Sequence, residues 1–315
     1  MKMAVKTLLG LSLLIVLLVA GWTVWNWQPD RSVEQLKPRW AGAPSQFLPV
    51  LGMQVHLRDE GPRSDPSPIV LLHGTSASLH TWQGWVQALA TERRVITLDM
   101  PGFGLTGPSP DADYRIEAYV RFVLAVVDKL GIQRFVLGGN SLGGQVAWQT
   151  AVAASTRVDR LILVDAAGYP FKSTSVPLGF RIARMPGINR LMEYTLPHAL
   201  VRSSVRNVYG DPTKVTTELV DRYFELTLRE GNRHALGQRF AQLNFQGHEK
   251  IKSIKLPTLI LWGGHDRLIP PENAAAFQRD IAGSQVVVFE TLGHVPHEED
   301  PVVTVDAVRR FLQKS

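Results

Sequence analysis

The chain has 315 residues, 45% of them hydrophobic and 20% charged, and 34 Lys and Arg against 28 Asp and Glu give a net charge of +6. This composition suits a globular protein with a large core and excludes a disordered or collagen-like chain. Because the chain has no cysteine and no long block of Lys and Arg, it excludes a disulfide scaffold, a thiolate nucleophile and a zinc finger, and it does not favour nucleic acid as a partner.

The first 27 residues form an apolar segment. No charged residue occurs between Lys6 and Asp30, and the run 8–24 is almost entirely apolar. A helix of this length is close to the thickness of a bilayer core, and three tryptophans cluster at its far end, where an interfacial belt would lie. We therefore expect residues 1–27 to be a single-pass membrane anchor, with a cleaved signal peptide as the alternative. The lysines before the run predict that the remainder of the chain is extracytoplasmic, as in a periplasm.

Residues 28–45 are polar and contain several prolines, and we interpret them as a linker. From residue 46, short runs rich in Val, Ile and Leu alternate with helical patterns, which predicts an α/β domain over 46–315 with a mainly parallel sheet. The predicted strands are 53–58, 69–72, 95–98, 134–137, 161–164, 258–261 and 286–289. Residues 171–250 interrupt this alternation with helix-like stretches, so we expect them to form a cap or lid over the strand ends.

The motif His73-Gly74-Thr75 directly follows the predicted strand 69–72. An acyl-transfer site needs two backbone N–H groups that point at the developing oxyanion, and one of them commonly comes from the loop after an early strand. We expect the Thr75 amide to be this donor. The His73 side chain is expected to order the loop.

A glycine pattern at 102–107 matches the spacing of a dinucleotide-binding loop. Such a site requires a helix that begins at the motif and presents its N-terminus to the pyrophosphate. Pro101 precedes the pattern, Pro108 and Pro110 follow it, and no helical pattern begins before about Tyr114. We therefore predict no nucleotide cofactor.

The segment Gly139–Gly144 has the sequence GNSLGG and lies between a predicted strand and a predicted helix. A nucleophile elbow needs this placement, because its serine occupies a strained turn whose neighbours must be small. We therefore expect Ser141 to be the nucleophile. The residue after the nucleophile supplies the other oxyanion donor, which assigns that role to the Leu142 amide.

Two further polar residues follow late strands. Asp266 comes after the strand 258–261, where a carboxylate can hold an imidazole in the required tautomer, and Asp165, at the end of 161–164, is the alternative acid. His294 follows the strand 286–289 and is the expected general base. The resulting chain order Ser, Asp, His is the order of the hydrolase fold. The spacing of histidines around His294 does not match a metal motif, so no metal is predicted.

Five motifs together resemble the α/β-hydrolase family across residues 50–315. In chain order they are HGTSASLHTW, DMPGFGLTG, GNSLGG, GGHDRLIP and GHVPHEEDP. The resemblance implies an α/β fold with a mostly parallel eight-stranded sheet and a helical cap inserted after the sixth strand, at about 171–250. It also implies a triad of Ser141, Asp266 and His294, with the Thr75 and Leu142 amides as the oxyanion hole and no cofactor.

The elbow narrows the choice within this family. Ser141 excludes epoxide hydrolases and haloalkane dehalogenases, which use an aspartate nucleophile. The sequence GNSLGG is similar to the elbow of meta-cleavage C–C hydrolases, although these usually carry a Trp shortly after the catalytic His, where this chain has Val295-Pro296-His297. Membrane-anchored monoacylglycerol lipases resemble the chain in having an N-terminal anchor and an elbow that ends in GGQVA.

We therefore expect a membrane-tethered serine esterase or lipase, acting on lipid-derived esters such as monoacylglycerols because anchoring would concentrate them. Apolar cap residues are expected to form an acyl tunnel: Phe171, Phe180, Met185, Met192, Phe224, Phe240 and Phe245. A C–C bond hydrolase of a soluble diketone is the alternative, and an inactive hydrolase fold used for binding is a third hypothesis. The oligomeric state is left open.

Overall fold

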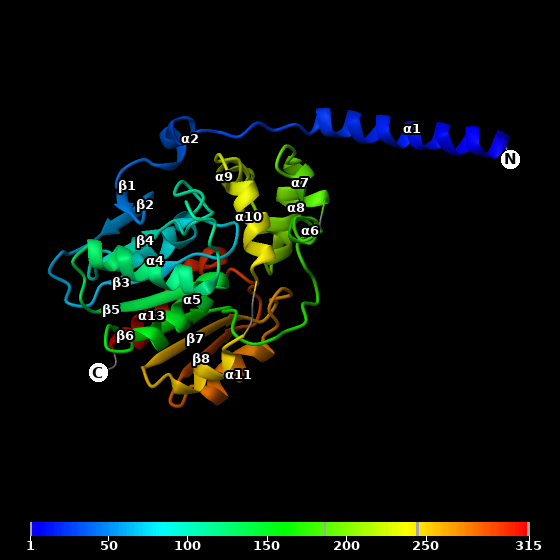
Figure 1. The fold of residues 1–315 in the computed structure, drawn as a ribbon. Coiled ribbons are helices and arrows are strands. Elements are labelled where there is room, and N and C mark those ends of the chain that lie inside the picture. The colour runs from blue at the N-terminus through cyan, green and yellow to red at the C-terminus, as the bar shows by residue number, and fades with distance from the viewer. Residues whose placement is uncertain (1, 186, 244–245, 314–315) are drawn as a thin grey trace.

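The computed structural model describes residues 2–185, 187–243 and 246–313. Within these residues, eight strands form one sheet in the order β1-β2-β4-β3-β5-β6-β7-β8 (Figure 1). The strands are β1 (Gln46–Val50), β2 (Met53–Glu60), β3 (Ile69–Leu72), β4 (Val95–Leu98), β5 (Phe135–Asn140), β6 (Val158–Val164), β7 (Thr258–Gly263) and β8 (Gln285–Phe289). β2 is antiparallel to β1 and β4, and the other pairs are parallel. The expected mostly parallel eight-stranded sheet is confirmed.

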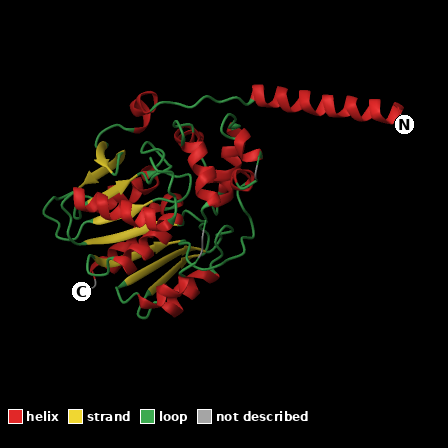
Figure 2. Ribbon diagram, viewed as in Figure 1, coloured by secondary structure: helices red, strands yellow, loops and turns green. Residues whose placement is uncertain are grey.

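Helices cover both faces of this sheet (Figure 2). One face carries α4 (Ile116–Lys129), α5 (Leu142–Ala153) and α11 (Glu272–Asp280), and the other carries α3 (Gln83–Leu89) and α13 (Pro301–Gln313). In β3, Val70 and Leu72 belong to the first core and Ile69 and Leu71 to the second, because successive strand residues point to opposite faces. All four side chains are buried, which explains why the parallel strands are continuous apolar runs.

The segment between β6 and β7 forms a helical cap (Figure 1). Its helices are α6 (Leu178–Ala183), α7 (Ile188–Leu191), α8 (His198–Val208), α9 (Thr217–Thr227) and α10 (Asn232–Ala241). Val205 of α8 and Val220 of α9 share a buried cluster with Val295, which belongs to the loop after β8. The cap therefore packs directly on the loop that carries His294.

Residues 26–41, here called the N-terminal strap, cross from the cap to the sheet domain. Backbone hydrogen bonds join Gln28 to Tyr194 at 2.9 Å and Arg31 to Leu228 at 2.7 Å. The strap contains α2 (Val33–Trp40), whose Trp40 carbonyl accepts a hydrogen bond from the His80 ring in the sheet domain at 2.9 Å. Since the cap and the sheet domain both bind this segment, residues 28–41 are part of the folded domain and not a free linker.

The N-terminal helix α1 (Lys2–Trp25) extends away from the domain (Figure 1). No helix in the described part of the chain reaches the length and apolarity needed to cross a membrane. The prediction of a transmembrane anchor over residues 1–27, and of the membrane-bound, extracytoplasmic location derived from it, is therefore wrong. Met1 lies outside the described residues, and the alternative of a cleaved signal peptide stays a prediction.

Candidate active site

Ser141 lies in the sharp turn between β5 and α5. Its φ and ψ angles are 55° and −113°, in a region that side-chain-bearing residues rarely adopt. The turn closes tightly, because a Cβ on Gly139 would overlap the carbonyl oxygen of Gly143, and a Cβ on Gly143 would overlap that of Leu72. The small residues of the GNSLGG motif are therefore required by the backbone, and they leave Ser141 partly exposed at the turn.

Asp266 and His294 meet at the same edge of the sheet, on the loops that follow β7 and β8. Oδ2 of Asp266 lies 2.7 Å from Nδ1 of His294, and each residue is only 4% exposed. Oδ1 of Asp266 accepts hydrogen bonds from the backbone N–H groups of Leu268 at 2.8 Å and Ile269 at 3.0 Å. The imidazole is thus held by Asp266, while Asp165, the alternative acid, makes no hydrogen bond to His294 among the described residues.

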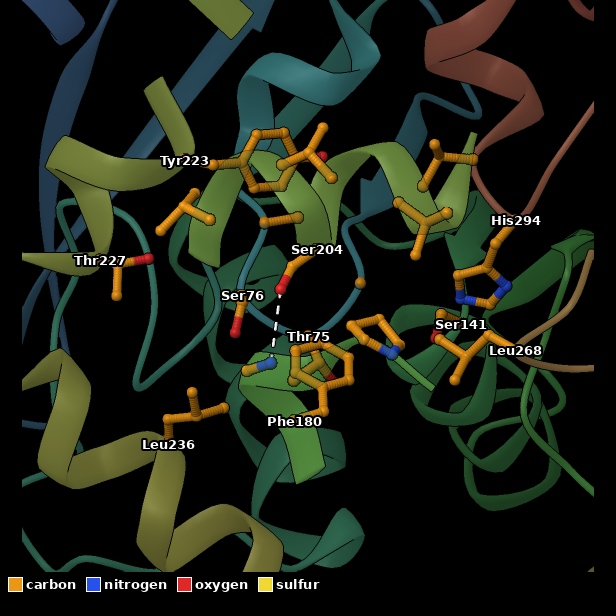
Figure 3. Close-up of a pocket in the computed structure, with 18 of the residues that line it drawn as sticks. Thr75, Ser76, Ser141, Phe180, Ser204, Tyr223, Thr227, Leu236, Leu268 and His294 are labelled. Atoms are coloured by element: carbon orange, nitrogen blue, oxygen red, sulfur yellow. Dashed lines mark hydrogen bonds between the residues drawn. The ribbon is translucent and has the colours of Figure 1, made fainter. Parts of the chain in front are cut away.

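Asn140 is a site residue that the sequence analysis did not identify. Its Nδ2 donates hydrogen bonds to the carbonyl oxygens of His294 at 2.9 Å and Val164 at 3.2 Å. The side chain is 2% exposed and directly precedes the elbow serine. It therefore fixes the His294 loop relative to Ser141, and both side chains face one cavity (Figure 3).

Glu299 is a second residue that the sequence analysis did not identify. Its carboxylate accepts backbone hydrogen bonds from Gly293 at 2.8 Å, from Gly210 at 2.9 Å and from Asp211 at 2.8 Å. Glu299 belongs to the short helix α12 (Pro296–Glu299) and is buried. This carboxylate joins the segment after cap helix α8 to Gly293, the residue that precedes His294. The sequence analysis did not identify Glu299, because no local pattern predicts such a long-range contact.

The amides expected to form the oxyanion hole are free. Neither the Thr75 nor the Leu142 N–H donates a hydrogen bond to another described residue. The loop is held by His73, whose Nδ1 lies 2.7 Å from the Gly74 carbonyl and whose Nε2 accepts a hydrogen bond from the Met100 amide at 2.9 Å. Burial lowers the pKa of His73, so the ring stays neutral and suits this pairing. Two unpaired N–H donors, one in this loop and one at the start of α5, can stabilise a developing oxyanion.

A cavity that opens to solvent lies between the cap and the sheet at Ser141, and its enclosed volume is about 110 Å³. Apolar side chains dominate its wall and come mainly from the cap: Phe180, Met192, Leu196, Leu200, Val201, Val205, Val208 and Leu236. No Lys, Arg, Asp or Glu occurs among the described residues that line it. Figure 3 shows Ser141 and His294 at one end and Thr227 and Leu236 at the other. The cavity can accept an elongated apolar group.

Only part of the expected acyl tunnel lines this cavity. Phe180 and Met192 do so. Phe171 and Phe240 are partly buried against the main core, and Phe224 packs with Leu196 and Leu228 inside the cap. Met185 is 45% exposed, and Phe245 lies outside the described residues.

One cluster of described side chains has the ligand types and spacing for a metal ion. Asp165, Asp266 and His294 are buried and each offers one ligand atom, all within 4.8 Å of one another. However, the shared Asp266–His294 contact of 2.7 Å has the length of a charge-assisted hydrogen bond, and it already engages one ligand atom of each residue. The geometry therefore fits a proton between these two groups better than a metal.

Comparisons with known proteins agree with the fold. The family model described as alpha/beta hydrolase fold matches residues 67–301. A 2-hydroxy-6-oxo-2,4-heptadienoate hydrolase of Pseudomonas putida is 30% identical over 253 residues, which cover 77% of this chain and 87% of that protein. The chain therefore belongs to the α/β-hydrolase family.

Two solved structures show the same fold. A meta-cleavage product hydrolase from Pseudomonas fluorescens, complexed with acetates, has a TM-score of 0.73 and 27% identity, covering 86% of this chain and 97% of that one. A thermophilic esterase from Thermogutta terrifontis has a TM-score of 0.70 and 25% identity, covering 85% and 97%. Similar proteins thus include both hydrolases of meta-cleavage products and an esterase.

Proposed function

We propose that this protein is a serine hydrolase that cleaves carboxylic esters with an apolar acyl chain. Ser141 is the nucleophile, His294 the general base and acid, and Asp266 the residue that orients the imidazole. The Thr75 and Leu142 amides form the oxyanion hole. The observation that carries the proposal is the cavity at Ser141, whose wall is apolar and uncharged among the described residues.

The reaction follows from this arrangement. Oγ of Ser141 attacks the ester carbonyl carbon, while Nε2 of His294 takes the hydroxyl proton and Asp266 holds the opposite Nδ1–H. The carbonyl oxygen becomes an oxyanion that accepts hydrogen bonds from the two free amides. Collapse of this intermediate breaks the ester bond, His294 protonates the alkoxide, and an acyl-enzyme remains. A water molecule then attacks the acyl carbonyl while it gives a proton to His294, and His294 passes this proton to Oγ of Ser141 as the acyl–oxygen bond breaks and the acid leaves.

The uncharged cavity supports an ester with an aliphatic chain. Burying such a chain contributes about 0.8 kcal/mol per CH₂ group, and a wall of Leu, Val, Met and Phe side chains provides this environment. Since no described helix can cross a membrane, the expectation that anchoring selects lipid esters does not support this proposal. The preference for an apolar chain rests on the cavity alone.

A C–C bond hydrolase is the second candidate, favoured by the 30% identity to the Pseudomonas putida enzyme. The compound in the name of that relative is a carboxylate. A buried carboxylate needs a cationic partner or several hydrogen-bond donors. The described lining offers hydroxyl groups such as those of Ser76 and Ser204 but no Lys or Arg, and its wall is mainly apolar, so we consider the ester the better match.

Initial rates separate the two candidates. We would measure kcat/KM for p-nitrophenyl esters from acetate to laurate and for a 2-hydroxy-6-oxo-dienoate, with Ser141→Ala as the inactive control. The proposal predicts ester turnover that rises with chain length and little turnover of the dienoate. A dienoate kcat/KM far above that of every ester would show that the C–C hydrolase is the correct assignment.

A further inference from the structure

Asp165 is a buried carboxyl group beside the candidate triad that the mechanism above does not use. It follows β6, is 0% exposed and has a φ of 44°. Its backbone is fixed by a hydrogen bond from its N–H to the Leu261 carbonyl at 3.0 Å. Oδ1 accepts a hydrogen bond from the Gly263 N–H at 2.9 Å, whereas Oδ2 is buried and receives no hydrogen bond from the described residues.

The charged and titratable groups around Asp165 are mostly acidic. Asp266 and His294 each place a polar atom within 4.8 Å of a carboxylate oxygen of Asp165, and Glu299 on α12 adds a further negative charge. Burial, followed by the Asp266 carboxylate, raises the pKa of Asp165 well above its ordinary value. Two adjacent buried carboxylates are costly to ionise together, so one of them keeps its proton.

Of the two carboxyl groups, Asp266 has more hydrogen-bond donors to stabilise a negative charge. Its Oδ1 accepts two backbone N–H groups, and its Oδ2 accepts the His294 Nδ1–H. Asp165 has one backbone donor, on Oδ1. Hydrogen bonds to the ionised form stabilise that form, so the proton belongs on the oxygen of Asp165 that lacks a donor.

We propose that Asp165 is a positioning residue that stays protonated and donates its Oδ2–H to Asp266. It would thus support the candidate triad as an additional, fourth residue. This inference rests on the proposed roles of Ser141, His294 and Asp266. The proton gives Asp266 a further donor and keeps the carboxyl pair at a single negative charge. With both carboxylates ionised, the imidazole would face two negative charges and would retain its own proton to higher pH, where it cannot act as a base.

A purely structural role for Asp165 makes a different prediction. Oδ1 of Asp165 holds the Gly263 amide at the end of β7, and an asparagine can supply the same acceptor. If that contact were the whole function, loss of the side chain would lower stability without changing how the rate depends on pH. The pH profile of Ser141 reactivity therefore distinguishes a positioning residue from a merely structural one.

The experiment measures the second-order rate of Ser141 phosphonylation by a fluorophosphonate over about pH 5 to 9. We would compare the wild type with Asp165→Asn and Asp165→Ala. The alanine variant should react about tenfold more slowly and its acid limb should move to higher pH, because Asp266 loses a donor. The asparagine variant keeps an N–H donor and should recover the rate to within about threefold of the wild type, with its acid limb in place.

If the substitutions removed a negative charge from Asp165, the acid limb of the pH profile would shift in the opposite direction. If Asp165 were ionised, both neutral substitutions would move the acid limb to lower pH, and this result would overturn the proposal. The proposal would also be overturned if the acid limb stayed at the wild-type pH in both variants. As a direct check, isotope-edited infrared difference spectra of wild type against Asp165→Asn should contain the carbonyl band of a protonated carboxyl group at pH 7 to 8, and absence of that band also contradicts the inference.

A matched control separates these effects from general destabilisation. Asp59 is another buried carboxyl group, but it lies on β2 and pairs with Arg94 at 2.9 Å. Asp59→Asn should lower thermal stability and leave the acid limb unchanged. A wild-type enzyme that does not react with the probe at any pH would instead refute the proposed serine hydrolase.

Discussion

The side-chain amide of Asn140 donates a hydrogen bond to the backbone carbonyl of His294 across 2.9 Å. This contact joins the residue before the nucleophile to the loop of the general base, although 154 positions separate them. A second bond, to Val164, anchors the same amide to β6. The placement of His294 relative to Ser141 therefore depends on a side chain that bonds to the His294 backbone and not to the imidazole ring.

Replacing Asn140 by alanine should lower kcat by about 10- to 100-fold, because small displacements of reacting groups are costly. The loss of two buried hydrogen bonds should also lower the free energy of unfolding by about 1–3 kcal/mol. Thr106→Val is the matched control. It too removes two buried hydrogen bonds, to Asp99 and His56, but away from the cavity. Equal losses of kcat in the two variants would show that destabilisation alone explains the effect.

Leu236 should set the longest acyl chain that the cavity accepts. It lies on α10 at the end of the cavity far from Ser141 (Figure 3). Leu236→Trp should lower kcat/KM for decanoate and laurate esters by about tenfold or more and leave the acetate ester nearly unchanged, since only long chains reach this side chain. Leu178→Trp, at an exposed cap position outside the cavity lining, is the control. An equal loss for all chain lengths would contradict this placement of the acyl group.

The N-terminal strap should stabilise the cap through Glu225. This carboxylate of α9 accepts hydrogen bonds from Trp40 Nε1 at 2.6 Å and Arg39 Nη1 at 2.9 Å, and it pairs with Arg31 at 3.0 Å. The two arginines are partly exposed, so each ion pair contributes less than about 1 kcal/mol. Glu225→Gln should lower the free energy of unfolding by about 1–2 kcal/mol and speed hydrogen exchange in α9.

Glu218→Gln is the control for the strap, since this exposed first-turn residue of α9 forms no ion pair with residues 26–41. It should leave hydrogen exchange in the cap unchanged. If Glu225→Gln behaves in the same way, the strap does not restrain the cap.

Buried imidazoles should make the protein sensitive to mild acid. Burial lowers the pKa of His73, lowers that of His80 to about 3, and, together with the neighbouring His294, lowers that of His297 well below its ordinary value. The unfolded chain therefore binds more protons below about pH 6.5, so stability present above that pH is lost as the pH falls. Urea unfolding at pH 7.5 and 5.5 should show this decrease.

His297 provides the sharpest test of this sensitivity. Its ring lies 3.9 Å from that of Trp82, centroid to centroid, and neither ring nitrogen has a partner among the described residues. His297→Phe should reduce the pH dependence of the unfolding free energy by up to about 1.4 kcal/mol per pH unit and should be stabilising at pH 5.5. His234→Phe, at a largely exposed side chain, is the control. An unchanged slope in His297→Phe would mean that the folded protein binds a proton there.

Apolar runs in the sequence predict most strands of the sheet, and they also show that Ser141, Asp266 and His294 each follow a strand. The GNSLGG turn is recognisable because its glycines are needed by the backbone around Ser141. β1 does not appear among the strands predicted from the apolar runs, since it contains Pro49 and pairs only at the sheet edge. The strap was interpreted as a linker for a similar reason, because its order comes from tertiary contacts with the cap.

The remaining features depend on residues that are distant in sequence. The hydrogen bonds of Asn140 and Glu299 cross between the sheet, the cap and the His294 loop. Composition predicts a tunnel of apolar cap residues, but Phe171 and Phe240 pack against the main core and do not line the cavity. The apolar run near the N-terminus predicted a membrane span that the described helices do not provide. Apolar runs and motifs report on the local structure of the chain, whereas the long-range hydrogen bonds and the cavity lining depend on how distant segments pack.

Peptide mass spectrometry after reaction with a fluorophosphonate tests the central claim most directly. The account predicts one phosphonyl adduct, on Ser141, that is absent in Ser141→Ala and forms at least about 1,000-fold more slowly in His294→Ala. An adduct on another residue, or equal labelling of the wild type and Ser141→Ala, would contradict it.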